Sequence, residues 1–290
     1  MREESQSEWV CGLDVCGEII EIGEDTLGWD KGDLVLYHGN MMRANGGFAE
    51  YAIQDSQTII KASSNLTAAQ QASIPCAGWT AYRAMIEKLN ISKGDNVFIS
   101  GGSGGVGSFA IQLAKNAGAK HIIASCSEKN FEYVKSLGAT HVINYNDKFL
   151  IEKALNYTDG YGIDKLLNTS GRSTDIALSD LLAFNGHFLE LLDVVRPTEY
   201  KDVFMRNLSF HQLSLGAAHR YGGDKAKNQL KKVGEKMLTL VENGSIELPL
   251  INTISIHEMP EILKEMRNAH TKGKYVLVFL EFNQPKFAYI

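Results

Sequence analysis

Several features that mark particular classes of protein are missing from this sequence. Its 290 residues carry a net charge of −5 and no dense run of lysine and arginine. This argues against a nucleic-acid partner, because proteins that bind nucleic acid concentrate basic charge. No apolar run is long enough to span a bilayer, so no membrane partner is expected. The four cysteines are scattered and form neither a disulfide framework nor a C-x-x-C zinc cluster. We therefore expect a globular protein of the reducing cytoplasm.

The most informative stretch that is present runs from Asn96 to Gly107, where a short apolar strand leads into glycines and then a helical pattern. Its glycines fit G-x-G-x-x-G, in which each glycine has a physical task. The first allows a tight turn, the second lets a pyrophosphate approach the backbone, and the third lets the helix pack on the strand. The N–H groups at the helix start then bind the anion. The predicted cofactor contacts are Gly102, Ser103, Gly104, Gly105, Val106 and Gly107. The alternative is a flexible glycine loop.

The residues before about Thr67 read as a β-rich domain. Short strands are predicted at 17–23, 32–37 and 46–53, each separated from the next by turn residues. Short strands divided by turns favour a barrel-like β domain. Two helices are then predicted, at 67–72 and 80–86.

Strand and helix patterns alternate through the middle of the chain. Strands are predicted at 97–100, 121–125, 141–144, 165–168 and 187–191, and helices at 130–136, 147–155 and 229–241. This alternation predicts an α/β fold with a doubly wound parallel sheet and helices on both faces. A helix at 259–267 and a strand at 273–279 are expected to return to the β domain. The predicted domains are 1–74 with 247–290, and 75–246.

Motifs spread along the chain occur in the order of a known superfamily. They are Gly12-Leu13-Asp14 with 17–23, and then 32–35, 46–51, 75–82, 136–145 and 272–277. Their order resembles the medium-chain dehydrogenase/reductase superfamily, and most closely its zinc-independent quinone oxidoreductase (zeta-crystallin-like) branch. The resemblance implies a Rossmann cofactor-binding domain, a GroES-like catalytic domain, a nicotinamide cofactor and a homodimer. Because the family places a β segment before the first motif, we expect the GroES-like domain to be incomplete at its N-terminal side.

The choice between NADPH and NADH is made after the second strand of such a domain. An acidic residue there binds the ribose 2′-OH of NAD and repels a 2′-phosphate. Here Ser127 and Lys129 suit a phosphate, and by resemblance Tyr145 packs beside it. Glu128 favours NADH if its side chain points inward. We predict NADPH, with NADH as the alternative.

The resemblance implies further contacts to the cofactor. Thr80 matches a threonine near the nicotinamide ribose, Asn207 lies in a segment similar to the loop near the nicotinamide, and Lys274 matches a position near the pyrophosphate. Tyr37 and Asn40 lie at a strand end that resembles the rim of the family's active-site cleft. They are the candidate catalytic hydrogen-bond donors, whereas His38 between them is expected to belong to a polar turn.

No metal is predicted. Zinc-dependent relatives have Gly-His-Glu where this chain has Gly12-Leu13-Asp14, and leucine cannot bind zinc. Cys76 matches a third zinc ligand of those relatives, but a catalytic zinc site needs three protein ligands. We therefore expect Cys76 to be a small buried residue.

The sequence leads to one preferred function and two alternatives. The preferred function is an NADPH-dependent, zinc-independent oxidoreductase that transfers hydride to a quinone or an α,β-unsaturated carbonyl. Such acceptors suit a site without a metal because the developing charge appears on a remote oxygen, which hydrogen-bond donors can stabilise. The alternatives are a zinc-type alcohol dehydrogenase-like enzyme and a nucleotide-binding protein without turnover.

Overall fold

The computed structural model describes residues 9–171, 174–267 and 273–279. The chain forms two compact units. The first unit comprises Met1–Trp79, Leu215–Gly244 and Leu248–Ile290, and the second comprises Thr80–Ser214 with Ser245–Glu247. The α/β fold class predicted from the sequence is confirmed.

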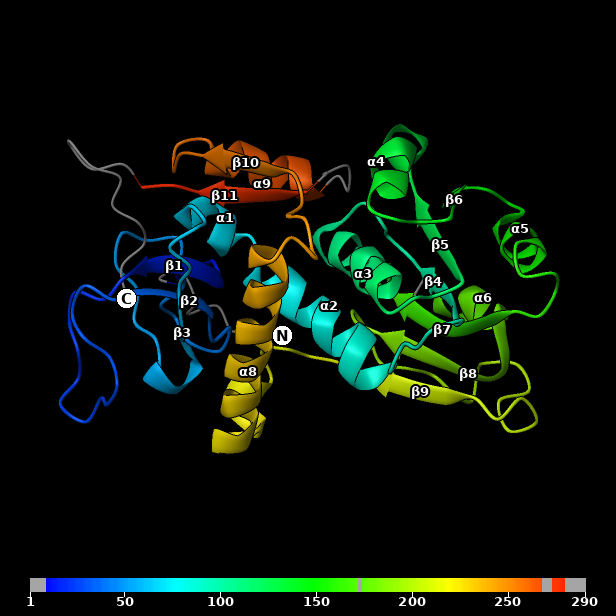
Figure 1. Cartoon of the computed structure of the whole chain (residues 1–290), viewed down its shortest axis with the longest axis horizontal. Coiled ribbons are helices and arrows are strands. Elements are labelled where there is room, and N and C mark those ends of the chain that lie inside the picture. Colours follow the sequence, from blue (N-terminus) through cyan, green and yellow to red (C-terminus); the bar gives the residue numbers. More distant parts are fainter. Residues whose placement is uncertain (1–8, 172–173, 268–272, 280–290) are drawn as a thin grey trace. The chain divides into compact units, whose positions relative to one another are not determined.

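The second unit is built on one six-stranded sheet in which every pair of neighbouring strands is parallel. The strand order is β6-β5-β4-β7-β8-β9, so the direction of winding reverses at β4 (Figure 1). β4 is the first strand of this sheet in the sequence. A parallel sheet whose strand order reverses at one strand opens a ligand crevice there, at the carboxyl ends of the strands. The strands are β4 (Asn96–Ile99), β5 (His121–Cys126), β6 (His141–Asn144), β7 (Ile163–Asn168), β8 (Leu182–Glu190) and β9 (Ser209–Gln212).

Apolar residues place this sheet in the core of the second unit. All four residues of β4 are buried, as expected for a central parallel strand with both faces covered. Phe98, Ile123, Leu166 and Phe188 belong to one hydrophobic cluster contributed by four neighbouring strands. The helical segments are α2 (Thr80–Tyr82), η3 (Arg83–Lys88), α3 (Gly105–Asn116), η4 (Glu128–Asn130), α4 (Phe131–Ser136), α5 (Leu150–Asn156) and α6 (Asp175–Ser179).

Among its described residues, the first unit contains two small sheets. In one, β1 (Asp14–Glu18), β2 (Leu34–His38) and β3 (Ile60–Lys61) are antiparallel, and in the other β10 (Ile251–Ile254) pairs in parallel with β11 (Lys274–Leu277). Val15, Val35 and Ile59 form part of a small core beneath the antiparallel strands. The helical segments are η1 (Ser56–Thr58), α1 (Ala68–Ala72), η2 (Pro75–Trp79), α7 (Ala218–Tyr221), α8 (Gly223–Glu242) and α9 (Met259–Arg267).

One strand predicted in this unit is wrong. The segment 46–53 is irregular, with only an isolated bridge at Tyr51. Its backbone instead bonds to the residues before β1, since the N–H groups of Gly46 and Phe48 donate to the carbonyls of Val10 and Cys11. A Cβ on Gly46 would lie 2.3 Å from the Val10 oxygen, so this close approach requires glycine. The strand predicted at 17–23 is also displaced, because β1 begins at Asp14 and ends at Glu18.

The compact units differ from the predicted domain boundaries in the segment 215–244. The sequence boundaries place this segment with the parallel sheet, whereas α8 packs in the first unit. Gly234 makes this packing possible, because a Cβ there would lie 2.6 Å from the ring of Trp79. Lys227 of the same helix forms an ion pair with Asp55 at 2.7 Å. The amphipathic pattern of α8 predicts a helix with one apolar face, but it does not say which part of the chain packs against that face.

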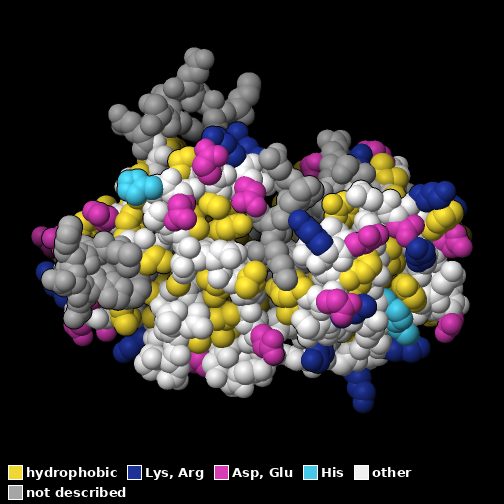
Figure 2. Space-filling model, turned by 90° about the horizontal axis from the view of Figure 1, so that it is seen from above, with side chains coloured by type: hydrophobic (Ala, Val, Ile, Leu, Met, Phe, Trp, Pro, Cys, Tyr) yellow, Lys and Arg dark blue, Asp and Glu magenta, His cyan; other side chains and the backbone are white. Residues whose placement is uncertain are grey.

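The charged surface agrees with the composition. On the face shown in Figure 2, lysine and arginine side chains are interspersed with aspartate and glutamate. Among the residues that the structure describes, no helix is long and apolar enough to cross a membrane.

Candidate functional site

The glycine loop between β4 and α3 has a geometry that only glycine allows. Gly101 has a φ of +68°, and a Cβ on Gly102 would lie 2.9 Å from the Cβ of Ala124. The tight turn therefore falls at Gly101, one residue before the position assigned to it from the motif. A Cβ on Gly107 would lie 2.3 Å from the Gly101 carbonyl oxygen, so the third glycine is needed for close packing of helix on strand, as predicted.

Helix α3 begins at this loop with N–H groups that donate to no backbone carbonyl among the described residues. Gly104 is its N-cap, and the Gly104 carbonyl accepts the first intrahelical bond from Ser108. The N–H groups of Gly105, Val106 and Gly107 precede that bond and have no acceptor one turn earlier. A helix start of this kind attracts phosphate oxygens through its N–H groups and the helix dipole.

Asn130 joins the glycine loop to the end of β5. Its side-chain amide donates to Ser103 Oγ and to Ser127 Oγ, each at 3.1 Å. Asn130 is buried, so the two hydroxyls are held on one fixed group. The structure thus brings together Ser103 and Ser127, which lie 24 positions apart in the sequence. Sequence analysis missed Asn130, although its place just after the second strand was a usable signal.

The carboxyl ends of β5 and β6 gather the residues that were predicted to select the cofactor. The Tyr145 N–H donates to the Cys126 carbonyl at 3.3 Å, which places Tyr145 beside the end of β5. Glu128 Oε1 accepts a hydrogen bond from the Asn144 amide at 3.0 Å. Lys129 is exposed.

Two other predicted cofactor contacts lie elsewhere in the second unit. Thr80 is the buried first residue of α2, which packs on α3. Asn207 comes just before β9 and contacts Asn185 near the start of β8. The amino ends of parallel strands share one edge of a sheet, opposite the edge that carries the glycine loop. The structure therefore does not bring Asn207 to the glycine loop.

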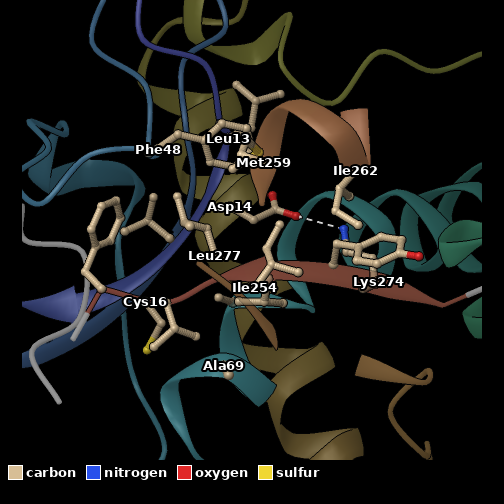
Figure 3. Close-up of a pocket in the computed structure, with 18 of the residues that line it drawn as sticks. Leu13, Asp14, Cys16, Phe48, Ala69, Ile254, Met259, Ile262, Lys274 and Leu277 are labelled. Carbon is tan, nitrogen blue, oxygen red and sulfur yellow. Dashed lines mark hydrogen bonds and ion pairs between the residues drawn. The ribbon is translucent and has the colours of Figure 1, made fainter. Parts of the chain in front are cut away.

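The first unit contains a pocket of about 350 Å³ that is lined mainly by apolar side chains. Figure 3 shows Leu13, Phe48, Met259 and other side chains around it, with Asp14 from β1 facing Lys274 from β11. Lys274 Nζ lies 3.2 Å from Asp14 Oδ2. Burial alone would lower the pKa of Lys274, but the Asp14 carboxylate outweighs burial and raises it. The expected pyrophosphate contact of Lys274 stays a prediction.

Cys76 and His38 complete a polar cluster with Asp14. The Cys76 N–H donates to Asp14 Oδ1 at 2.9 Å. Potential ligand atoms of Asp14, His38 and Cys76 all lie within 4.8 Å of one another. Burial raises the pKa of the Cys76 thiol to about 12 and lowers the pKa of His38. His38 is 2% exposed, and its Nδ1 has no hydrogen-bond partner among the described residues.

The two predicted catalytic donors are not in this cluster. Tyr37 is 3% exposed and packs with Val15 and Val35 in the small core, where burial raises the pKa of its phenol. Asn40 uses its side-chain oxygen to accept the Met42 N–H at 2.9 Å, and so closes a turn. The polar turn that was expected around His38 is made by Asn40 instead, while His38 is buried. Alternation along β2 is the signal that could have separated Tyr37 from His38, because neighbours in a strand face opposite sides.

The comparisons with known proteins agree with this architecture. Residues 2–64 match the alcohol dehydrogenase GroES-like domain, and residues 105–238 match the zinc-binding dehydrogenase family. A quinone oxidoreductase of Coxiella burnetii is similar, with 26% identity, a TM-score of 0.78, and coverage of 93% of this chain and 79% of that one. A quinone oxidoreductase of Pseudomonas syringae pv. Tomato has 19% identity and a TM-score of 0.79, with 92% and 81% covered. That match supports the fold.

Two curated relatives match over a shorter stretch. The chloroplastic quinone-oxidoreductase QR1 of Triphysaria versicolor is 39% identical over 142 residues, which are 47% of this chain and 43% of that protein. A zinc-type alcohol dehydrogenase-like protein of Staphylococcus epidermidis is 36% identical, covering 47% and 42%. The chain spans less than half the length of these curated relatives.

The parallel sheet, the glycine loop and the two family matches together define a two-domain dehydrogenase architecture. The chain belongs to the medium-chain dehydrogenase/reductase superfamily.

The polar cluster of Asp14, His38 and Cys76 has the composition of a zinc site. Aspartate, histidine and cysteine are all zinc ligands, and their ligand atoms are close enough together. Both Asp14 oxygens, however, are already used, one by the Cys76 N–H and one by the Lys274 ammonium. A zinc ion here would lie beside a fixed positive charge and compete with it for the same carboxylate. The residues as arranged do not fit zinc.

Proposed function

We propose that this chain is an NADPH-dependent, zinc-independent oxidoreductase that transfers hydride to a quinone or an α,β-unsaturated carbonyl. The observation that carries the proposal is the glycine loop at the carboxyl end of β4, the strand at which the sheet reverses. An open parallel sheet binds its ligand in the crevice at such a point. When bound, the nicotinamide supplies the hydride. The similarity to quinone oxidoreductases supports the reaction class.

The network around Asn130 supports the part of the proposal that concerns binding. The N–H groups at the start of α3 hold the pyrophosphate, while Ser103 and Ser127 offer hydroxyls fixed by one buried amide. Glycine at 101, 102 and 107 lets the loop, α3 and the neighbouring strands approach closely, because a Cβ at each would lie within 3.0 Å of Thr169, Ala124 or the Gly101 carbonyl. This close packing holds the start of α3 at the carboxyl end of β4.

The surroundings of β5 favour NADPH over NADH. Glu128, the residue that would favour NADH, is engaged by the Asn144 amide. Ser127 and Lys129 then remain to receive the 2′-phosphate beside Tyr145, whose backbone is bonded to the end of β5. A phosphate prefers a hydroxyl and a cation to a carboxylate, because its own charge is negative. NADH remains the alternative cofactor.

Acceptors that delocalise charge suit the polar cluster of the first unit. Reduction of a quinone or an enone places negative charge on an oxygen remote from the hydride, and a fixed cation or hydrogen-bond donor lowers the energy of that charge. Lys274 is such a cation at the wall of an apolar pocket. The homodimer and the cytoplasmic setting stay predictions from the resemblance and the composition.

Calorimetric titration with NADPH and, separately, NADH tests the cofactor. NADPH is expected to bind at least about tenfold more tightly, because only NADPH uses the phosphate contacts. Tighter binding of NADH would identify Glu128 as the ribose ligand and contradict the proposal. Loss of NADPH absorbance with 1,4-benzoquinone or cyclohex-2-enone as acceptor then tests the reaction. Binding without oxidation by either acceptor class would favour the nucleotide-binding protein without turnover. Stoichiometric zinc in the purified protein would favour the alcohol dehydrogenase-like alternative.

A further inference from the structure

Four polar groups from distant parts of the sequence meet in the first unit, and three of them, Asp14, Cys76 and Lys274, line its apolar pocket. Asp14 comes from β1, His38 from the end of β2, Cys76 from η2 and Lys274 from β11. Lys274 lies 260 positions after Asp14 in the sequence and 3.2 Å from its carboxylate. Figure 3 shows the pair among apolar side chains such as Ile254 and Ile262.

Three of these groups form a ligand set for a divalent metal. A thiol, an imidazole and a carboxylate are the ligand types that bind zinc and cobalt, and their ligand atoms lie within 4.8 Å of one another. His38 supplies a second, independent observation, because it is 2% exposed and its Nδ1 is unpaired among the described residues. A buried polar atom without a partner is costly, so it marks a place where a ligand would be favourable.

The ammonium group of Lys274 lies beside the Asp14 carboxylate, where a bound metal ion would otherwise balance the carboxylate charge. A carboxylate in apolar surroundings requires an opposite charge, and the ammonium of Lys274 provides it. Its side chain is 21% exposed and that of Asp14 is 12% exposed, so water screens the pair only in part. A divalent ion at the same carboxylate would meet this fixed positive charge.

We propose that Lys274 is a built-in cation that keeps the site of Asp14, His38 and Cys76 free of divalent metal. Removing the charge at position 274 converts the three residues into a metal site. The metal binds as the Cys76 thiol releases one proton, so that a metal–sulfur bond replaces the sulfur–hydrogen bond and the proton passes to solvent. This inference goes beyond the proposed function and does not depend on which acceptor is reduced.

Cobalt titration of Lys274→Met and of the unaltered protein tests the proposal. Co²⁺ bound by a thiolate absorbs in the near ultraviolet and in the visible, so the readout needs no activity. We expect these bands in Lys274→Met, with an apparent affinity at least about tenfold tighter than in the unaltered protein. Adding Cys76→Ser should remove the ultraviolet band. Lys274→Arg keeps the charge and should resist the metal as the unaltered protein does.

Lys227→Met is the matched control. Lys227 also pairs with a carboxylate of the first unit, at 2.7 Å from Asp55, and its side chain is 22% exposed. Its loss should produce no cobalt bands. Circular dichroism and thermal unfolding establish that each variant is folded, and Lys274→Gln replaces Lys274→Met if the latter is not.

Two results would overturn the proposal. Thiolate–cobalt bands in the unaltered protein, at the concentrations that saturate the variant, would show that Lys274 does not exclude metal. Folded Lys274→Met or Lys274→Gln without bands would show that the three residues are not a metal site. Neither result bears on NADPH binding, which is measured separately.

Discussion

The side-chain amide of Asn168 donates a hydrogen bond of 2.6 Å to the carboxylate of Glu190, and both residues are almost completely buried. Burial raises the pKa of Glu190, although hydrogen bonds from Leu192 and Asn168 oppose this effect. Ser100 donates to the other side of the Asn168 amide at 2.8 Å. Because these residues end or follow β7, β8 and β4, the network fixes the carboxyl edge of the sheet beside the glycine loop.

Asn168→Asp is expected to destabilise the protein by about 2–4 kcal/mol near neutral pH, because two carboxylates would then share one buried site. One of the two must take up a proton, so its pKa in the folded state rises above the unfolded value. Stability is therefore retained at low pH and lost as the pH rises through that raised pKa. Urea unfolding at about pH 7 and about pH 4.5 measures the difference.

Asn144→Asp is the control for this variant, because Asn144 donates to the exposed Glu128 at 3.0 Å. Its effect should stay within about 1 kcal/mol, since water screens exposed charges. Equal losses of stability in the two variants would contradict the role of burial.

Gly107→Ala should damage the glycine loop and the cofactor site together. The new Cβ would lie 2.3 Å from the Gly101 oxygen and 2.8 Å from the Gly102 Cα, so α3 must move away from β4. We expect a loss of about 1–3 kcal/mol in the free energy of unfolding. NADPH affinity should fall at least about tenfold, because the helix start no longer meets the pyrophosphate.

Thermal unfolding and calorimetry measure the two effects of Gly107→Ala. Gly23→Ala is the control, since its Cβ would meet only the Thr26 hydroxyl, at an ordinary 3.5 Å. If Gly107→Ala bound NADPH as tightly as the unaltered protein, α3 would not be the phosphate site.

Lys129→Ala should weaken NADPH binding about fivefold and leave NADH binding unchanged. The expected effect is modest because Lys129 is exposed, and exposed charge pairs contribute about 1 kcal/mol. Raising the salt concentration should reduce the difference between the variant and the unaltered protein, because salt screens the pair. Lys135→Ala, which removes an exposed lysine paired with Glu132, is the control and should bind both cofactors normally. An equal loss for NADH would rule out a contact with the 2′-phosphate.

Asp175 makes the second unit sensitive to acid. It is 1% exposed, and burial opposes its charge, but hydrogen bonds from Arg196 and Tyr200 outweigh burial and lower its pKa. Because the folded pKa lies below the unfolded value, the stabilisation is present above the unfolded pKa and is lost as the pH falls through the folded pKa.

Arg196→Met is therefore expected to cost about 2–4 kcal/mol near neutral pH and less in acid, as measured by urea unfolding across a pH series. Lys264→Met removes an exposed partner of Glu261 and should cost almost nothing. A deficit in Arg196→Met that did not shrink in acid would show that the lost contacts, rather than the charge of Asp175, account for it.

Local patterns predicted most of the parallel sheet. The predicted bounds agree within one residue for the strands at His141–Asn144 and 97–100 and for the helix at Met259–Arg267. These elements are predictable because apolar periodicity and terminating glycines depend only on residues that are close in sequence. The segment 46–53 was misjudged because its glycines accommodate a close backbone approach from Val10 and Cys11. Such a contact leaves no periodic signal.

The polar cluster was beyond the reach of sequence reasoning. Asp14 is separated by 62 residues from Cys76 and by 260 residues from Lys274 in the sequence, and only the folded chain brings them into contact. Cys76 was expected to be buried, whereas it is half-buried in the structure, and its partners were not identified. His38 was expected in a polar turn, whereas it is buried at the end of β2.

The interleaving of the two units has a consequence for the order in which the chain is synthesised. The second unit is completed by Ser245–Glu247, where Glu247 exchanges hydrogen bonds of 2.8 and 2.9 Å with the side chain of Gln112 in α3. Every residue of that unit has then been made, whereas the first unit still awaits β10, α9 and β11. The unit that begins first therefore finishes last. During synthesis, Asp14 has no ion-pair partner in Lys274 until 260 further residues have been added to the chain.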